Sequence, residues 1–156
     1  MTTDIIEPSG AENALDELAE ATLEAPAIEE AAPETRTFAA FGVIEPIVRA
    51  LADVGIVHPF PIQALTLPVA LQRHDIIGQA KTGTGKTLGF GLPLLQSIVA
   101  PGEEGFDTLP TAGKPQALVV GPTRELAVQV AGDLATASRH RKVRVIQLYG
   151  GRAYEP

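Results

Sequence analysis

The stretch AKTGTGKT, residues 80–87, decides the fold of this chain. It follows an apolar run, residues 75–80, that predicts a short buried strand, and it leads into a helical pattern from about Gly85. Gly83 and Gly85 allow backbone angles that other residues avoid, and they let amide N–H groups approach phosphate oxygens. The start of the following helix adds unpaired N–H donors and the positive end of its dipole. A strand, a glycine-rich turn and a helix in this order predict a phosphate-binding P-loop.

Each part of this loop has an expected role in binding a nucleoside triphosphate. Lys86 is expected to reach the β- and γ-phosphates, and the Thr87 hydroxyl to coordinate Mg²⁺. The general pattern begins with glycine, where this chain has Ala80. A chance glycine turn before a helix is the alternative, and Lys81 is equally well explained as a solvated loop lysine. The expected phosphate-binding residues are Ala80, Lys81, Thr82, Gly83, Thr84, Gly85, Lys86 and Thr87.

Helical and strand-like patterns alternate on both sides of the loop, and the strands are apolar on both faces. This alternation predicts an α/β fold in which helices flank a parallel sheet. Pro68 is expected to bend or break its helix, and Gly89, Gly91 and Pro93 to kink theirs. Glycine and proline make residues 101–115 a surface loop. The expected strands are residues 75–80, 116–121 and 143–149. The expected helices are residues 43–51, a segment from 61, a segment from 85, and residues 123–138.

Composition narrows the class of protein. The chain has 156 residues, 45% of them hydrophobic, which is enough to bury a core and excludes complete disorder. It has no cysteine, which excludes disulfide scaffolds and thiolate metal sites. No apolar run approaches the ~20 residues of a membrane span, and the start of the chain lacks the pattern of a secretory signal. A cytoplasmic protein without membrane contact is therefore expected.

The net charge of −7 is unevenly distributed along the chain. Residues 1–36 carry a net charge of −9, whereas residues 37–156 carry +2. The first segment is rich in Ala, Glu and Pro and has no aromatic residue, so a disordered acidic tail is expected. A short helix that ends before Pro26 and docks on a protein partner is the alternative. The remainder, residues 37–156, is expected to form the folded domain.

Five segments resemble the DEAD-box RNA helicases, in the order of that family. The Ala-first loop 80–87 is similar to motif I, and GIVHPFPIQ, residues 55–63, to the Q motif. Phe38 matches the isolated upstream aromatic residue, PTRELA at 122–127 resembles motif Ia, and Gly150-Gly151 the paired-glycine motif. The resemblance covers residues 37–156. It implies an incomplete first RecA-like domain that uses ATP and Mg²⁺ and acts on RNA.

Adenine recognition is expected near the Q-motif-like segment. An amide side chain can donate to N7 of adenine and accept from its amino group, so Gln63 is suited to select ATP over GTP. By resemblance Gln63 has this role, and Phe38 is a candidate to stack on the base. The alternatives are a helix-capping glutamine and a core phenylalanine. Ile56 stands where the family usually has phenylalanine, which weakens any inference about aromatic packing there.

The segment that resembles motif Ia is a candidate contact for RNA. Thr123 and Arg124 stand where a predicted strand ends and a helix starts, so amide, hydroxyl and guanidinium groups can bind a phosphodiester. By resemblance these residues contact the RNA backbone, which predicts binding that tolerates any sequence and weakens with salt. The alternatives are a plain N-cap for Thr123 and a surface ion pair of Arg124 with Glu125 or Asp133.

Two further segments are weaker candidates for the RNA surface. Gly150 and Gly151 contact RNA by resemblance, but a simple turn explains them equally well. The basic run of residues 139–144 is better explained as a solvated face than as an RNA surface.

The chain contains no Asp-Glu-Ala-Asp segment, no Ser-Ala-Thr motif and no second RecA-like domain. Phosphoryl transfer needs an acidic residue for Mg²⁺ and a group that orients the attacking water. We therefore expect this chain alone to bind ATP and RNA weakly, to hydrolyse ATP very slowly and to leave duplexes closed. The expected context is the amino-terminal part of a longer helicase.

Two other interpretations remain open at the level of sequence. A different P-loop ATPase or small-molecule kinase shares the loop, although no segment suggests an acceptor site or a lid. A non-catalytic module that binds nucleotide or RNA, with the acidic tail docking a partner, is the other.

Overall fold

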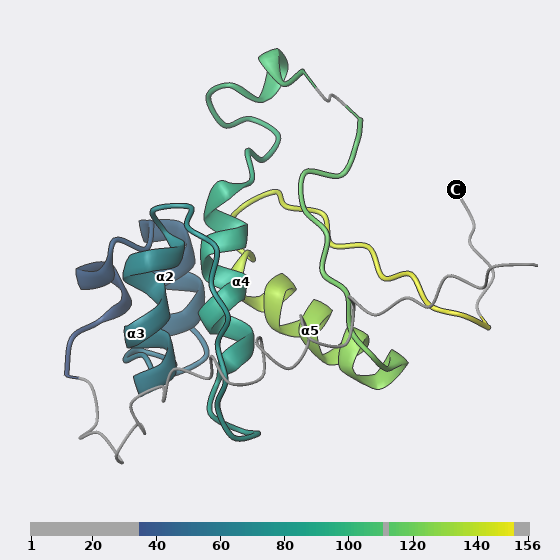
Figure 1. Cartoon of the computed structure of the whole chain (residues 1–156). Coiled ribbons are helices and arrows are strands. Elements are labelled where there is room, and N and C mark those ends of the chain that lie inside the picture. Colours follow the sequence, from purple (N-terminus) through teal and green to yellow (C-terminus); the bar gives the residue numbers. More distant parts are fainter. Residues whose placement is uncertain (1–34, 111–112, 152–156) are drawn as a thin grey trace, which may run out of the picture. The chain divides into compact units, whose positions relative to one another are not determined.

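The computed structural model of this chain describes residues 35–110 and 113–151 (Figure 1). The expected tail therefore lies outside the described residues, except for its last two positions. Of these, the Arg36 guanidinium lies 4.4 Å from the centre of the Phe41 ring. No helix within the described ranges is long and apolar enough to cross a membrane.

Four α-helices and two short 3₁₀ helices form within the described ranges. The predicted helices are confirmed, with ends within a few residues of those expected. Local signals explain their starts: Pro61 occupies the first turn of its helix, Gly85 precedes the next, and Thr123 caps the last. The α-helices are α2 (Glu45–Ala52), α3 (Pro61–Ala70), α4 (Lys86–Ser97) and α5 (Arg124–Ala137). The 3₁₀ helices are η1 (Phe38–Phe41) and η2 (Phe106–Thr108).

The hydrophobic core lies where α3 packs on α4 and α5 packs on both α4 and α2. Each helix presents an apolar face to this core, and burying one such side chain stabilises the fold by about 1.5–3 kcal/mol. The buried members of the cluster are Phe38, Val43, Ile47, Leu51, Leu67, Leu92, Leu95, Val130, Leu134 and Ala137.

The glycines of α4 serve packing. The helix runs without interruption from Lys86 to Ser97, and Gly89 and Gly91 are both buried. A Cβ on Gly91 would lie 2.7 Å from Cδ2 of Leu134 on α5, which is closer than side-chain contacts allow. The missing side chain at Gly91 thus lets α5 approach α4, whereas Gly89 faces Thr66 on α3. Of the bend or break predicted at Pro68, the break is wrong, because α3 continues through it to Ala70. The bend stays a prediction.

We expect Gly91→Ala to destabilise the protein, although alanine is the better helix former. The added methyl group meets Leu134, which is buried in the core, so overpacking should cost about 1–3 kcal/mol. Gly132→Ala on α5 is the matched control, because nothing lies within 4 Å of a Cβ there. It should stabilise the fold by roughly 0.5–1 kcal/mol through helix propensity alone. Thermal unfolding of both variants measures the difference, and a shift of the same sign in both would contradict this explanation.

The predicted parallel sheet is wrong for the described residues, which contain no strand. Residues 75–80, 116–121 and 143–149 run as irregular segments. Val143 and Val145 pack against the core, but other apolar side chains of these segments stay open to solvent. Leu118 is 80% exposed and Ile146 73% exposed. A strand is stable only beside a partner about 4.8 Å away, and the pairing of these segments is not formed.

The side chain of Gln116 fixes the start of one of these irregular segments. The Gln116 amide accepts a hydrogen bond from Val99 N at 3.0 Å and donates one to Val99 O at 2.8 Å. The end of the surface loop is thereby tied to the residues that follow α4.

Arg141 anchors the end of α4, although the sequence suggested a solvated basic face. Its guanidinium donates to the carbonyl oxygens of Leu95 and Ile98, both at 2.5 Å. It also binds both carboxylate oxygens of Glu103, at 2.6 and 2.5 Å. These hydrogen bonds hold the pKa of Glu103 below its ordinary value, against the opposing effect of burial. For Arg141, which is 4% exposed, the expectation of a solvated face is wrong.

Candidate functional site

The P-loop-like segment curls around the side chain of Lys86. The Lys86 ammonium donates to the carbonyl oxygens of Ala80 at 2.6 Å and Lys81 at 2.5 Å. Thr84 Oγ1 donates to Lys81 O at 2.8 Å and closes the turn. Gly83 and Gly85 have φ angles of 82° and 78°, in the left-handed region that glycine tolerates best. The loop is therefore already bent at the two positions that the sequence identified.

This geometry concentrates positive charge at the start of α4. Gly85 immediately precedes the helix, so the first amide groups of α4, which have no acceptor within the helix, face the loop. The Lys86 ammonium lies at the same end, and Thr87 stands in the first turn. Amide donors, a helix dipole and a cation together form a site suited to an anion such as a polyphosphate.

Gln63 links α3 to the loop. Its side chain is 1% exposed and uses both ends of the amide. Oε1 accepts from Phe60 N at 2.9 Å, and Nε2 donates to Gly85 O at 2.8 Å. The first bond caps α3, as the helix-capping alternative expected. One N–H and one lone pair of the amide remain for a ligand, so adenine recognition by Gln63 stays a prediction.

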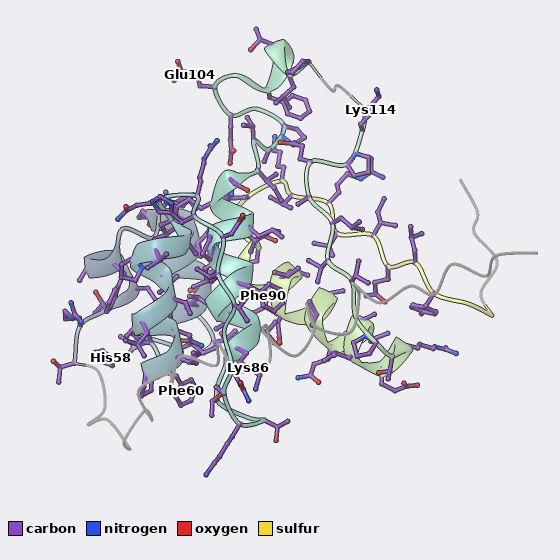
Figure 2. All side chains as sticks on the ribbon, viewed as in Figure 1. His58, Phe60, Lys86, Phe90, Glu104 and Lys114 are labelled. Carbon is purple, nitrogen blue, oxygen red and sulfur yellow. The ribbon has the colours of Figure 1, made fainter. Side chains whose placement is uncertain are left out.

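The two phenylalanines near this region occupy different environments. Phe38 is 1% exposed inside the core, as the alternative of a core phenylalanine expected, and its stacking on the base stays a prediction. Phe60 is 54% exposed and lies beside the loop. Its Cδ2 would be 2.8 Å from a Cβ on Gly85. Figure 2 shows Phe60 and Lys86 near the same end of the paired helices α3 and α4. Phe60, which stands three residues before Gln63, is not among the site residues expected from the sequence.

A cavity of about 700 Å³ connects the loop to the segment that resembles motif Ia. Helices α4 and α5 form one side of it, and the irregular segments after residues 116 and 142 form the other. Its lining includes Lys86 and Thr87 at one end of α4, Thr123 and Arg124 at the start of α5, and Gly150. The structure thus brings together residues from three of the predicted site segments.

At the start of α5, the guanidinium of Arg124 lies over a tyrosine ring. Thr123 caps the helix, because its Oγ1 accepts from Leu126 N at 3.2 Å. The Arg124 guanidinium lies 4.8 Å from the centre of the Tyr149 ring. The expected alternative was an ion pair with Glu125 or Asp133, but the ion pairs found among the described residues do not include Arg124. Gly151 has a φ of 81°, so the paired glycines form a turn directly after the tyrosine.

The basic run at 139–144 is divided among different environments. The first two residues of the run contact Asp53. Its Oδ2 lies 3.9 Å from the Arg139 guanidinium and 2.6 Å from His140 Nε2. Arg141 is buried, as described above. Lys142 and Arg144 are exposed. The run is therefore not one continuous cationic surface.

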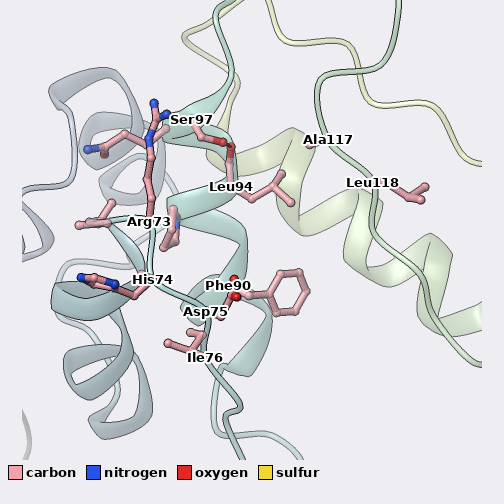
Figure 3. Close-up of a pocket in the computed structure, with 13 residues that line it drawn as sticks. Arg73, His74, Asp75, Ile76, Phe90, Leu94, Ser97, Ala117 and Leu118 are labelled. Atoms are coloured by element: carbon pink, nitrogen blue, oxygen red, sulfur yellow. Dashed lines mark hydrogen bonds between the residues drawn. The ribbon is translucent and has the colours of Figure 1, made fainter.

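A second hollow, of about 710 Å³, lies between α4 and the irregular segments on either side of it (Figure 3). In Figure 3 the Phe90 ring points toward the segment that carries Leu118, whereas His74 points away from it. The polar residues Arg73, His74 and Asp75 along this hollow are exposed. This hollow offers no buried polar group that would fix a ligand.

Comparison with known proteins agrees with the resemblance of the motifs. Residues 60–156 match the model of the DEAD/DEAH box helicase family. The chain is 49% identical over 92 residues to the DEAD-box ATP-dependent RNA helicase CshA of Bacillus cereus. It is 45% identical over 98 residues to the ATP-dependent RNA helicase RhlB of Shewanella amazonensis. These alignments cover 59% and 63% of this chain.

Solved structures show the same relationship. The RNA helicase Prp28 from Chaetomium thermophilum, bound to ADP, matches with a TM-score of 0.65 and 33% identity, over 80% of this chain and 29% of Prp28. Dbp5 of S. cerevisiae, bound to RNA and ADP BeF₃, matches with a TM-score of 0.56 and 27% identity, over 68% of this chain and 25% of Dbp5.

The relatives are much longer than the aligned segments. The matched part amounts to 16% of the length of CshA and 22% of RhlB. The family model nevertheless matches well over half of this chain, and it spans the P-loop, the motif Ia segment and the paired glycines. The chain therefore belongs to the DEAD/DEAH box helicase family.

Proposed function

We propose that this chain is the ATP-binding portion of an RNA helicase that couples ATP hydrolysis to the remodelling of RNA duplexes. The loop at 80–87, bent around Lys86 at the start of α4, is the observation that carries the proposal. In this function the loop amides and Lys86 bind the triphosphate, and Gln63 reads adenine through its remaining donor and acceptor. A cytoplasmic location remains the expectation from the sequence.

Magnesium fits this site only together with the nucleotide. No group of three or more His, Cys, Asp or Glu residues that would hold a metal forms within the described ranges. The ion would be held by phosphate oxygens and the Thr87 hydroxyl, in the manner usual for Mg²⁺ beside nucleotides. Bound there, Mg²⁺ would offset the charge of the phosphates. Lys86 and the helix amides provide the part of this neutralisation that the chain itself supplies.

On the RNA side, Thr123, Arg124 and the paired glycines are proposed to contact the sugar–phosphate backbone. The related Dbp5 structure is bound to RNA and ADP BeF₃, which supports RNA as a ligand of this part of the chain. Such contacts carry no base sequence, so binding should be nonspecific and sensitive to salt. The acidic segment 1–36 remains a candidate for docking a protein partner.

Nucleotide selectivity tests the proposed role of Gln63. Calorimetric titration with Mg-ATP and Mg-GTP should show a preference for ATP in the unaltered chain and little preference in Gln63→Ala. One mispaired amide is worth roughly 1–3 kcal/mol, so the preference should fall by about tenfold. The ratio of the two affinities is the readout, because Gln63 also caps α3 and its loss weakens the fold for both nucleotides alike. A folded, unaltered chain that binds neither Mg-ATP nor Mg-GTP in this titration would refute the proposed function.

A further inference from the structure

We propose that Tyr149 is a positioning residue for RNA binding: its ring holds Arg124 in the orientation that presents the guanidinium edge to a phosphate. This role rests on the proposed function and adds to it a residue that none of the motif segments contains. The geometry of two neighbouring elements carries it.

The contact joins two segments that are far apart in the sequence. Arg124 is the first residue of α5, and Tyr149 directly precedes the Gly150-Gly151 turn. The guanidinium carbon lies 4.8 Å from the ring centre, within the range of a cation–π contact. Arg124 is exposed and Tyr149 half-buried, so the ring provides a fixed support beneath a solvent-facing cation. One stack therefore connects the motif Ia segment to the paired glycines.

A stacked guanidinium remains able to bind a phosphate. When a ring lies against the flat face of a guanidinium, the N–H donors still point outward in the plane of the fork. A free arginine loses about 2 kcal/mol of rotamer entropy when it is fixed, and a preformed stack removes part of that cost. The exposed Lys142 and Arg144 show no such ring contact among the described residues, so Arg124 is the better oriented cation.

The surroundings of the stack favour a phosphodiester over a protein carboxylate as its partner. Within the described ranges no acidic side chain forms an ion pair with Arg124, whereas Arg49, Arg139 and Arg141 each have one. The first amides of α5 lie beside it, and the backbone of Gly150 and Gly151 carries no side chain that would block an approaching strand. These donors follow a backbone and do not select a base.

Titration of a fluorescent single-stranded oligouridine with the full 156-residue chain, at several salt concentrations, tests this role. Tyr149→Leu should weaken binding by about threefold, the effect of losing an exposed cation–π contact. It should also lower the slope of log K against log salt by up to about 0.7, the value of one phosphate contact. Tyr149→Phe keeps the ring and should restore both. In an Arg124→Ala background, Tyr149→Leu should change nothing further.

Each other outcome overturns the proposal. If Tyr149→Phe loses as much affinity as Tyr149→Leu, the hydroxyl and not the ring face is required. If Tyr149→Leu weakens binding equally in the Arg124→Ala background, the tyrosine acts without the arginine. If the unaltered chain binds RNA and Tyr149→Leu binds it with the same affinity, only the positioning role is refuted. A folded, unaltered chain without any RNA affinity would refute the RNA-binding part of the proposed function as well.

Discussion

Gly85→Ala is expected to destabilise the fold by about 3 kcal/mol and to weaken Mg-ATP binding by roughly tenfold or more. The φ of 78° at this position costs a non-glycine residue about 1–2 kcal/mol. A Cβ would also lie 2.3 Å from Gln63 Nε2 and 2.8 Å from Phe60 Cδ2. The exposed Phe60 ring has room to move. Gln63 is buried and bonded on both sides, so it yields only by breaking a hydrogen bond.

Gly83→Ala separates the two causes. Gly83 has a φ of 82°, but nothing lies within 4 Å of a Cβ there. This control should therefore lose only the conformational part, about 1–2 kcal/mol. Denaturant unfolding without nucleotide measures stability, and calorimetry with Mg-ATP measures binding. Equal losses of stability in the two variants would show that the close approach of the added Cβ to Gln63 costs no stability.

Arg141→Met is expected to be the most destabilising substitution outside the loop, at about 3 kcal/mol. It removes the guanidinium donor from the carbonyl oxygens of Leu95 and Ile98, of which Leu95 O keeps a bond from Ile98 N, and it leaves Glu103 without its partner. Glu103 is partly exposed, so water recovers some of this loss, which places the estimate at the lower end for buried pairs. A loss of this size is a large fraction of the stability of a small domain.

Arg139→Met is the matched control for this substitution. Arg139 stands two residues away, is half exposed and lies 3.9 Å from Asp53. Exposed pairs of this kind contribute at most about 1 kcal/mol. Chemical denaturation of the two variants side by side should therefore give clearly different midpoints. Similar midpoints would mean that the anchor at the end of α4 contributes little.

Local signals predicted the helices well. Thr123 as an N-cap, Pro61 in a first turn and Gly85 before α4 each act within a few residues, so their effect is readable from the sequence. The bend of the P-loop follows from the same kind of signal. The sheet was predicted from apolar runs alone, and its formation depends on pairing between distant segments. In this structure those runs remain unpaired, as the exposed Leu118 and Ile146 show.

The contacts that the sequence did not reveal are the long-range ones. Arg141 stands in a run of charges that resembles a solvated face, and only the path of the chain turns it toward Leu95 and Ile98. The contact of Tyr149 with Arg124 joins the first residue of α5 to a position well beyond the end of that helix. A tyrosine next to paired glycines was the available signal, but glycine turns and aromatic residues are each too common to indicate a contact.

If Gln63 reads adenine as proposed, its amide would also make the P-loop respond to the identity of the base. Guanine offers an acceptor where adenine offers a donor, so Gln63 would have to rotate its amide to meet it. That rotation would place like groups against Phe60 N and Gly85 O and break both bonds. Mispairing would thereby loosen the P-loop around the phosphates. The affinity for GTP would then fall at the phosphates as well as at the base.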